Sequence, residues 1–316
     1  GNGSGVDAYG NPVYVPYENQ CYGPEFDGSL VDIGRVDEFG EIQQVTYEAR
    51  PDEKPNFFET GITIQNDLSY SAGSANSTFY LSFQDATVKG VILGDELRRD
   101  AIRVNGSRNY GGFRAAFNVN YVHTNRENTT GGVYWMVMNT PMHIPLTRYS
   151  DWRNDHWSDP SHYFNEYYRS PYTTRDLDRA TSKNDDLIGT IDLSQKITPW
   201  LSAQIRATVS FTSRVYHNYE KALYFSDWVH TTPRSVSNND DPASVSDGSS
   251  YYMRWTNDAL ITADKRFGDI STKFIVGATT RDYYGKSVGI SAGTLEIPGV
   301  YNVNNRVGDL GGSSSY

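Results

Sequence analysis

The chain has 316 residues, of which 37% are hydrophobic and 14% aromatic, and its mean hydropathy is −0.60, a combination typical of all-β proteins with long polar loops. The formal net charge of −10 and the pI of about 5.1 argue against a nucleic-acid partner. Cys21 is the only cysteine, which excludes an intramolecular disulfide and a metal site built from several cysteines.

Residues 1–56 are rich in Gly, Asn, Pro and acidic side chains and show no hydrophobic period, so we expect a long loop with short pieces of structure. Alternation of apolar and polar residues begins near Phe58 and runs to Ala72, and a second alternating run follows at 79–84. Successive side chains of a strand point to opposite faces. The two runs and the short turn at 73–77 therefore predict an antiparallel hairpin.

The same alternation predicts three more hairpins further along the chain. In each, two amphipathic strands are separated by a turn of only a few residues, which is the usual signal for antiparallel pairing. The three turns are predicted at 109–112, at 198–200 and at 268–269, between strands at 102–108 and 113–122, 187–197 and 201–213, and 257–267 and 274–278.

Short and long connections between the predicted strands lie at opposite ends of the sheet. Each strand reversal carries the chain to the other end, so the four short turns share one end and the long segments share the other. Short turns, long loops and strands of about ten alternating residues are typical of outer-membrane barrels. We predict an all-β fold, an antiparallel transmembrane β-barrel of which about eight strands are present, with long extracellular loops at 1–56, 85–101, 125–186, 214–253 and 284–316.

The strand at 201–213 indicates what the two faces of the sheet contact. Leu201, Ile205 and Val209 fall on one parity, whereas Gln204 and Arg206 fall on the other. In a barrel, the side chains of the apolar parity would face lipid, and those of the polar parity would face a water-filled lumen. A soluble β-sandwich or propeller gives the same alternation and stays an alternative at this point. Other charged residues assigned to the polar parity are Glu59, Arg114, Asp192 and Lys196.

Four short motifs are spread over nearly the whole chain. They comprise Tyr22, Gly23, Pro24, Asp27 and Gly28; Phe57, Phe58, Thr60, Gly61 and Thr63; Thr140, Pro141, Ile144, Pro145 and Leu146; and Pro298, Gly299, Tyr301 and Asn302. No single motif is specific, but their order and their place between barrel hairpins resemble the SusC/RagA-like TonB-dependent transporters of Bacteroidetes outer membranes. Tyr22 departs from that family's usual Trp.

The resemblance implies uptake of oligosaccharides or peptides through a large outer-membrane barrel that is plugged by an N-terminal domain. It also implies the TonB–ExbB–ExbD system as the energy source and a SusD-like surface lipoprotein as the partner. Because neither a TonB box nor a plug domain is recognised here, we expect residues 1–316 to be part of the barrel domain of a longer protein. Contact with TonB–ExbB–ExbD would then require the missing N-terminal part.

A transporter of this kind would be a multi-pass barrel surrounded by outer-membrane lipid. It would bind no nucleic acid, needs no cofactor and is not an enzyme, since transport requires no catalytic residue. A dimer of transporter–lipoprotein pairs is one assembly that the resemblance leaves open. Two further alternatives are a soluble all-β carbohydrate-binding protein and a secreted glycoside hydrolase, which would need two facing carboxylates.

Aromatic residues crowd two of the predicted extracellular loops. Sugar rings and peptide side chains stack on aromatic rings, while Tyr hydroxyls and Trp N–H groups still reach polar partners. The alternative is that these rings pack the loops together or meet the partner lipoprotein. The candidate substrate-binding residues are Trp152, Trp157, Tyr163, Tyr167, Tyr168, Tyr224 and Trp228.

Two other patterns in the loops have simpler explanations. His156 and His162 stand near Asp155 and Asp159, but no helix fixes their spacing, so we expect no metal site there. The apolar run at 133–138 would favour aggregation if it were fully exposed. We therefore expect it to fold back or to face a partner.

Overall fold

A computed structural model describes residues 23–232 and 239–315, so Cys21 and Tyr22 lie outside the described part. Its main element is one nine-stranded antiparallel sheet in which each strand pairs with its neighbours in sequence. All four predicted hairpins and their turns are confirmed. The strands are β3 (Ile62–Ser74), β4 (Ser77–Lys89), β5 (Glu96–Tyr110), β6 (Phe113–Asn128), β7 (Asp178–Thr198), β8 (Leu201–Glu220), β9 (Ser244–Phe267), β10 (Ile270–Ala292) and β11 (Gly311–Ser315).

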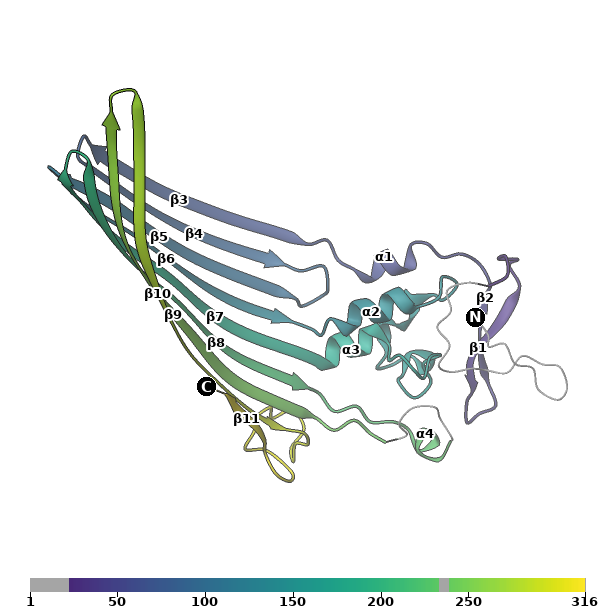
Figure 1. Ribbon diagram of the computed structural model, residues 1–316. Coiled ribbons are helices and arrows are strands. Elements are labelled where there is room, and N and C mark those ends of the chain that lie inside the picture. Colours follow the sequence, from purple (N-terminus) through teal and green to yellow (C-terminus); the bar gives the residue numbers. More distant parts are fainter. Residues whose placement is uncertain (1–22, 233–238, 316) are drawn as a thin grey trace.

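The sheet forms a single curved layer, with the short turns at one end and the helices and long loops at the other (Figure 1). It does not close on itself within the described residues, where β3 and β11 are the two ends of the strand order. The all-β, partly barrel-like fold is therefore confirmed. No helix in the described ranges is long and apolar enough to cross a membrane.

The strands reach further into the long segments than the alternation indicated. β6 and β7 shorten the segment predicted at 125–186, and β8 and β9 shorten the one at 214–253. The segment at 284–316 contains the end of β10 and all of β11. In the extensions of β6 and β7 both parities are polar, so the hydrophobic period disappears although the backbone pairing continues.

The strand register keeps the two kinds of side chain on separate faces of the whole sheet. One row joins Leu81 of β4 to Val104 of β5, and Val104 to Val119 of β6. No second layer of the described chain covers this apolar face, because Leu68 is 74% and Ile205 is 60% exposed. A sandwich core on this face is therefore excluded for the described residues.

The opposite face is polar and satisfies much of its own hydrogen-bonding capacity. Asp192 accepts a hydrogen bond from Gln204 Nε2 at 2.6 Å and forms a salt bridge with Arg206 at 2.9 Å. Thr190 and Thr208 share a hydrogen bond at 3.1 Å. Glu59 precedes β3, so its assignment to this face was wrong: the strand begins only at Ile62, after Gly61.

The apolar band runs obliquely across the strands. Register partners starting from Tyr70 in β3 carry no charge as far as Trp255 in β9, but the next partner is Asp282 in β10. On β10 the exposed apolar side chains of this face, Phe274 and Val276, lie nearer the turn. Strands in a closed barrel tilt relative to its axis, so a horizontal lipid layer crosses them at a slant. The oblique band has the form that such a tilt produces.

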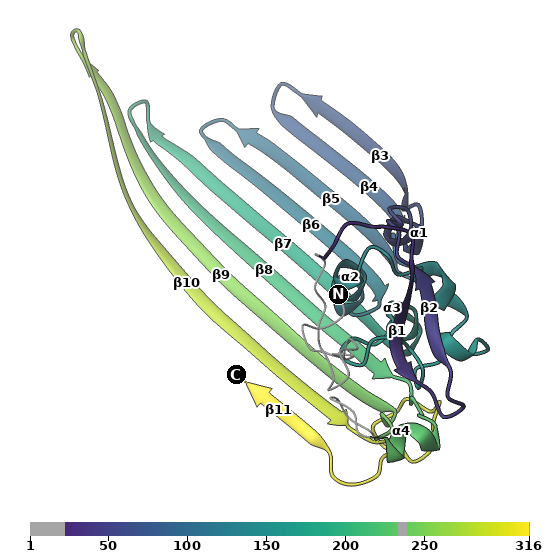
Figure 2. The same ribbon diagram turned by 90° about the vertical axis from the view of Figure 1, so that its right-hand side faces the viewer.

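The long segments fold together into a cap at the end of the sheet away from the turns (Figure 2). Its core contains Val133, Val137, Leu146 and Tyr149, each 0% exposed. The expectation that the run at 133–138 folds back is met only in part: α2 buries Val133 and Val137, but Tyr134, Trp135 and Met138 stay exposed. The cap elements are β1 (Leu30–Val36), β2 (Ile42–Thr46), α1 (Glu53–Phe57), α2 (Gly132–Asn139), η1 (Leu146–Asp151), η2 (His156–Ser158), α3 (Pro171–Leu177) and α4 (Asp227–Thr231).

Candidate functional site

Two adjoining cavities lie where the polar face of the sheet meets the cap. One, the cap cavity, has a volume of about 460 Å³ and is bordered mainly by cap residues. The other, the strand cavity, has a volume of about 670 Å³ and is bordered by the cap-side ends of β6 to β10. Thr130, Asp178 and Glu220 line both, so the two cavities meet at these three residues.

Strand pairing forces two carboxylates together at this junction. Asp178 is the first residue of β7 and is the register partner of Glu220, the last residue of β8. Directly opposite side chains on one face have Cβ atoms about 5 Å apart, and like charges there repel. Burial, followed by the charge of Glu220, raises the pKa of Asp178 to about 6. This residue lies beyond the apolar band, whose last β7 member on this side is Leu187.

Arg169 forms salt bridges with Glu220 of this pair and with Asp241, but with Asp178 it forms none. Its guanidinium forms a salt bridge with Glu220 at 3.0 Å and another with Asp241. The Oδ1 atom of Asp178 is buried and accepts no hydrogen bond within the described residues. The junction is therefore acidic, with three carboxylates and one guanidinium.

Two buried hydroxyls line the cap cavity together with these carboxylates. Ser170 and Thr174 are each 2% exposed and line the cap cavity. Neither side-chain oxygen has a hydrogen-bond partner among the residues that the structure describes. A buried hydroxyl without a partner costs about 1–3 kcal/mol, which a ligand able to hydrogen-bond would recover.

The strand cavity has positive charges at its other end. Arg126 of β6 and Arg214 of β8 line it, and both are exposed. Arg126 is opposite Ser182, and Arg214 is opposite Asn184, so both lie on the same face as Asp178. No salt bridge or side-chain hydrogen bond of either arginine occurs in the described part of the chain. The joined cavities thus have an acidic end and a basic end.

The aromatic candidates from the sequence do not form one cluster. Tyr163 and Tyr167 line the cap cavity, where Tyr163 is 7% and Tyr167 is 54% exposed. Trp152 is buried in the cap core and its indole N–H donates to Asp176 Oδ2 at 3.1 Å. Tyr168 packs edge-on against Tyr167 with ring centroids 4.9 Å apart.

The remaining three candidates lie elsewhere in the cap. Trp157 and Trp228 border a cavity of only about 10 Å³, which has no room for a substrate. Tyr224 is 62% exposed and lines neither of the joined cavities. A substrate contact by any of the seven residues stays a prediction, but their surroundings favour Tyr167.

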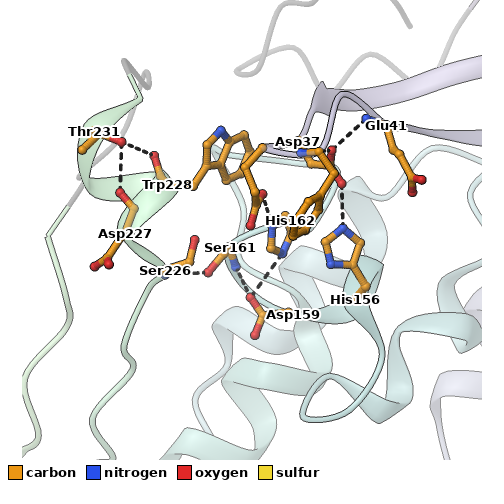
Figure 3. Close-up of polar contacts among 12 residues, drawn as sticks. Asp37, Glu41, His156, Asp159, Ser161, His162, Ser226, Asp227, Trp228 and Thr231 are labelled. Carbon is orange, nitrogen blue, oxygen red and sulfur yellow. Dashed lines mark hydrogen bonds and ion pairs between the residues drawn. The ribbon is translucent and has the colours of Figure 1, made fainter.

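His156 and His162 connect the β1–β2 hairpin to the rest of the cap (Figure 3). His156 Nε2 lies 2.9 Å from Asp37 Oδ2, and His162 Nε2 lies 2.8 Å from Glu38 Oε2. His162 also stacks on the indole of Trp228 at 5.2 Å between ring centroids. We call this group the histidine clasp. In the described ranges, no three or more His, Cys, Asp or Glu side chains are arranged to hold a metal ion.

Opposing effects set the protonation of the clasp. Burial lowers the pKa of His162, but hydrogen bonds and charges from Asp159 and Glu38 outweigh it and raise that pKa above its usual value. Burial raises the pKa of Asp37, but hydrogen bonds from the Glu41 N–H and from His156 outweigh it, so the pKa is lowered overall. The clasp therefore favours a charged imidazolium opposite ionised carboxylates.

Sequence reasoning missed the charged residues that line the joined cavities. Asp178 and Arg126 fall in the segment predicted at 125–186, and Glu220 and Arg214 fall in the one predicted at 214–253. One signal was present: even-numbered residues of 187–197 and 201–213 were already assigned to the polar face. Extending that parity along both strands puts Asp178, Glu220 and Arg214 on the same face.

No protein-family model matches the chain, and no curated protein sequence matches it. Solved structures do resemble its fold. They include "Structure of the RagAB peptide transporter", at a TM-score of 0.58, 13% identity and 85% coverage of this chain. The "closed-closed" state of the RagAB peptide importer matches with a TM-score of 0.61, 15% identity and 86% coverage of this chain. For the "open-open" state the TM-score is 0.56, the identity 14% and the coverage 83%.

The likeness concerns the fold alone, because the identities are this low. This chain covers 30%, 30% and 29% of those three chains, respectively. This chain therefore spans only about a third of the length of the transporter chains that resemble its fold.

Proposed function

We propose that residues 1–316 form part of the barrel of a TonB-dependent transporter of the SusC/RagA type in a bacterial outer membrane. The observation that carries this proposal is the sheet itself, which is a single layer with a bare apolar face and a polar face that leads to cavities beneath a cap. The fold likeness to RagAB transporter chains supports it. Lipid would cover the apolar face, and the cap would lie outside the cell.

The transported substrate is proposed to be a peptide rather than an oligosaccharide. The joined cavities have charged groups of both signs, which suit the charged ends and side chains of peptides better than a neutral sugar. Structurally similar chains belong to a peptide transporter, which agrees with this choice. A SusD-like lipoprotein above the cap and TonB–ExbB–ExbD beneath the barrel complete the proposed system.

Membrane insertion is tested on the full-length protein. We expect it to stay in the membrane fraction without detergent and to run at a different apparent size on a gel before and after boiling. A protein that stays in the aqueous phase and is not heat-modifiable would contradict the proposal, whatever its ligand.

The assignment of the two faces has a separate test on neighbouring residues. In a background without other cysteines, Ile205→Cys should resist a water-soluble maleimide, whereas Arg206→Cys should react with it, because the two side chains point to opposite faces of β8. Equal labelling of both positions would rule out a lipid-covered apolar face.

A further inference from the structure

The acidic and basic ends of the joined cavities match the two ends of a free peptide. We propose that they bind a short zwitterionic peptide, with its ammonium group at Asp178 and its carboxylate at Arg126 and Arg214. This inference rests on the proposed peptide transport and adds the orientation of the substrate and the residues that recognise its two ends.

The acidic end has one cation, Arg169, for the three carboxylates Asp178, Glu220 and Asp241. Arg169 is engaged by Glu220 and Asp241, which leaves the buried Oδ1 of Asp178 without a partner. An ammonium group has three N–H donors and fits a carboxylate that is surrounded by further acceptors. The donor set favours an ammonium over a metal ion, because no described group of three or more ligating side chains could hold a metal.

The buried hydroxyls supply a second observation that points to a ligand. Ser170 and Thr174 line the cap cavity beside the junction, and their oxygens can accept hydrogen bonds but have no partner within the described chain. Together with Asp178 they give the wall of this cavity three side chains that can accept hydrogen bonds from an ammonium group. Aromatic contact from the exposed ring of Tyr167 is available on the same wall.

The spacing of the two ends sets the peptide length. Arg126 is opposite Ser182, four residues along β7 from Asp178, which corresponds to about 13 Å. Arg214 is opposite Asn184, six residues from Asp178, which corresponds to about 20 Å. An extended peptide of roughly four to six residues spans this range. Its carboxylate could then pair with either guanidinium or lie between both.

The test compares three peptides on the full-length protein in detergent, with any partner that co-purifies. Penta-alanine has both charged ends, N-acetyl-penta-alanine lacks the ammonium, and penta-alanine amide lacks the carboxylate. We expect each modification to weaken binding about tenfold or more in isothermal titration calorimetry, because each removes a charge-assisted hydrogen bond. Asp178→Asn should bind penta-alanine and its acetylated form about equally.

The opposite end is tested by the double variant Arg126→Gln/Arg214→Gln, which should no longer distinguish penta-alanine from its amide but should still reject the acetylated form. Asp258→Asn is the matched control, because Asp258 lies on the same face, bonds Thr279 at 2.8 Å and lines neither cavity. It should keep both preferences. Heat-modifiability of each variant shows that it is folded.

Equal binding of all three peptides by the unsubstituted protein would overturn the inference, as would a preference that persists in Asp178→Asn. Binding of none of them by a heat-modifiable protein would also overturn it. In that case the barrel proposal would still stand, because its gel and labelling tests do not involve these cavities.

Discussion

At the scale of single residues, the pairing of Asp178 with Glu220 has consequences for stability. Its raised pKa means that ionised Asp178 is disfavoured in the folded state relative to the unfolded chain. The stability associated with the protonated group is complete below its ordinary value of 3.8 and is lost as the pH rises through about 6. Glu220 and Asp241 oppose the ionisation of Asp178, whereas Arg169 favours it.

Asp178→Asn removes this repulsion without changing side-chain size. We expect the variant to be more stable than the parent protein at neutral pH, by on the order of 1 kcal/mol after solvent screening. The difference should vanish near pH 4, where the parent carboxyl is protonated. Thermal unfolding of both proteins across this pH range measures it, and a constant difference at all pH values would refute the pairing.

Tyr167 and Tyr224 form a matched pair among the aromatic candidates. Both are more than half exposed, but only Tyr167 lines the cap cavity. Tyr167→Ala should weaken binding of a peptide about threefold to tenfold, as expected for loss of one aromatic contact. Tyr224→Ala should leave that affinity unchanged, and calorimetry with the same peptide compares them. If both substitutions changed the affinity for the peptide equally, Tyr167 would not belong to the candidate site.

At the scale of elements, the β1–β2 hairpin is attached to the cap through the histidine clasp and through apolar packing of Ile33 and Val45. The turn of the hairpin is itself ordered by Asp37, whose Oδ1 accepts the N–H groups of Phe39 and Glu41 at 2.9 and 2.8 Å. One carboxylate thus shapes the turn and also binds the cap.

The strength of this attachment should depend on pH. The raised pKa of His162 gives stability that is lost as the pH rises through that pKa, above 6.5. The lowered pKa values of Asp37 and Glu38 give stability that is lost in acid. Hydrogen exchange of residues 30–46, corrected for intrinsic rates, should therefore be faster at about pH 8.5 than at about pH 6.

His162→Gln provides the control for the clasp. Glutamine keeps a polar group of similar reach but does not titrate, so exchange in the hairpin should no longer change between these two pH values. A parent-like pH dependence in this variant would assign the effect to another group.

At the scale of the whole molecule, the two faces of the sheet should tolerate charge very differently. Ile205→Arg puts a cation on the apolar face, where lipid would make it cost about 2–4 kcal/mol near the bilayer midplane. Gln204→Arg adds the same charge one residue away on the polar face, where Gln204 itself donates a hydrogen bond to Asp192. Folding yield into detergent or lipid vesicles should fall for the first variant only. Similar losses for both would argue against a membrane-facing surface.

Within the described residues, the four family-like motifs lie in the cap or next to it rather than along the centres of the strands. Tyr301 of the last motif stacks on Tyr219 at 4.3 Å, and Asn305 just after it bonds the carbonyls of Ile297 and Val300. Ile144 and Leu146 of the third motif are buried in the cap core. These motif residues therefore stabilise the loops, whereas the strands require only an alternation of apolar and polar residues.

The sequence by itself determined the hairpins, the turns and the two faces of the sheet, because each depends on a local period of two and on residues that favour turns. Only the tertiary structure decided where β6 ends and where β7 begins, since polar residues on both faces there leave no hydrophobic period in the sequence. It also decided the cavities. Asp178 and Glu220 become neighbours only when β7 and β8 pair in one register, and the cap closes over them through contacts between loops far apart in the chain.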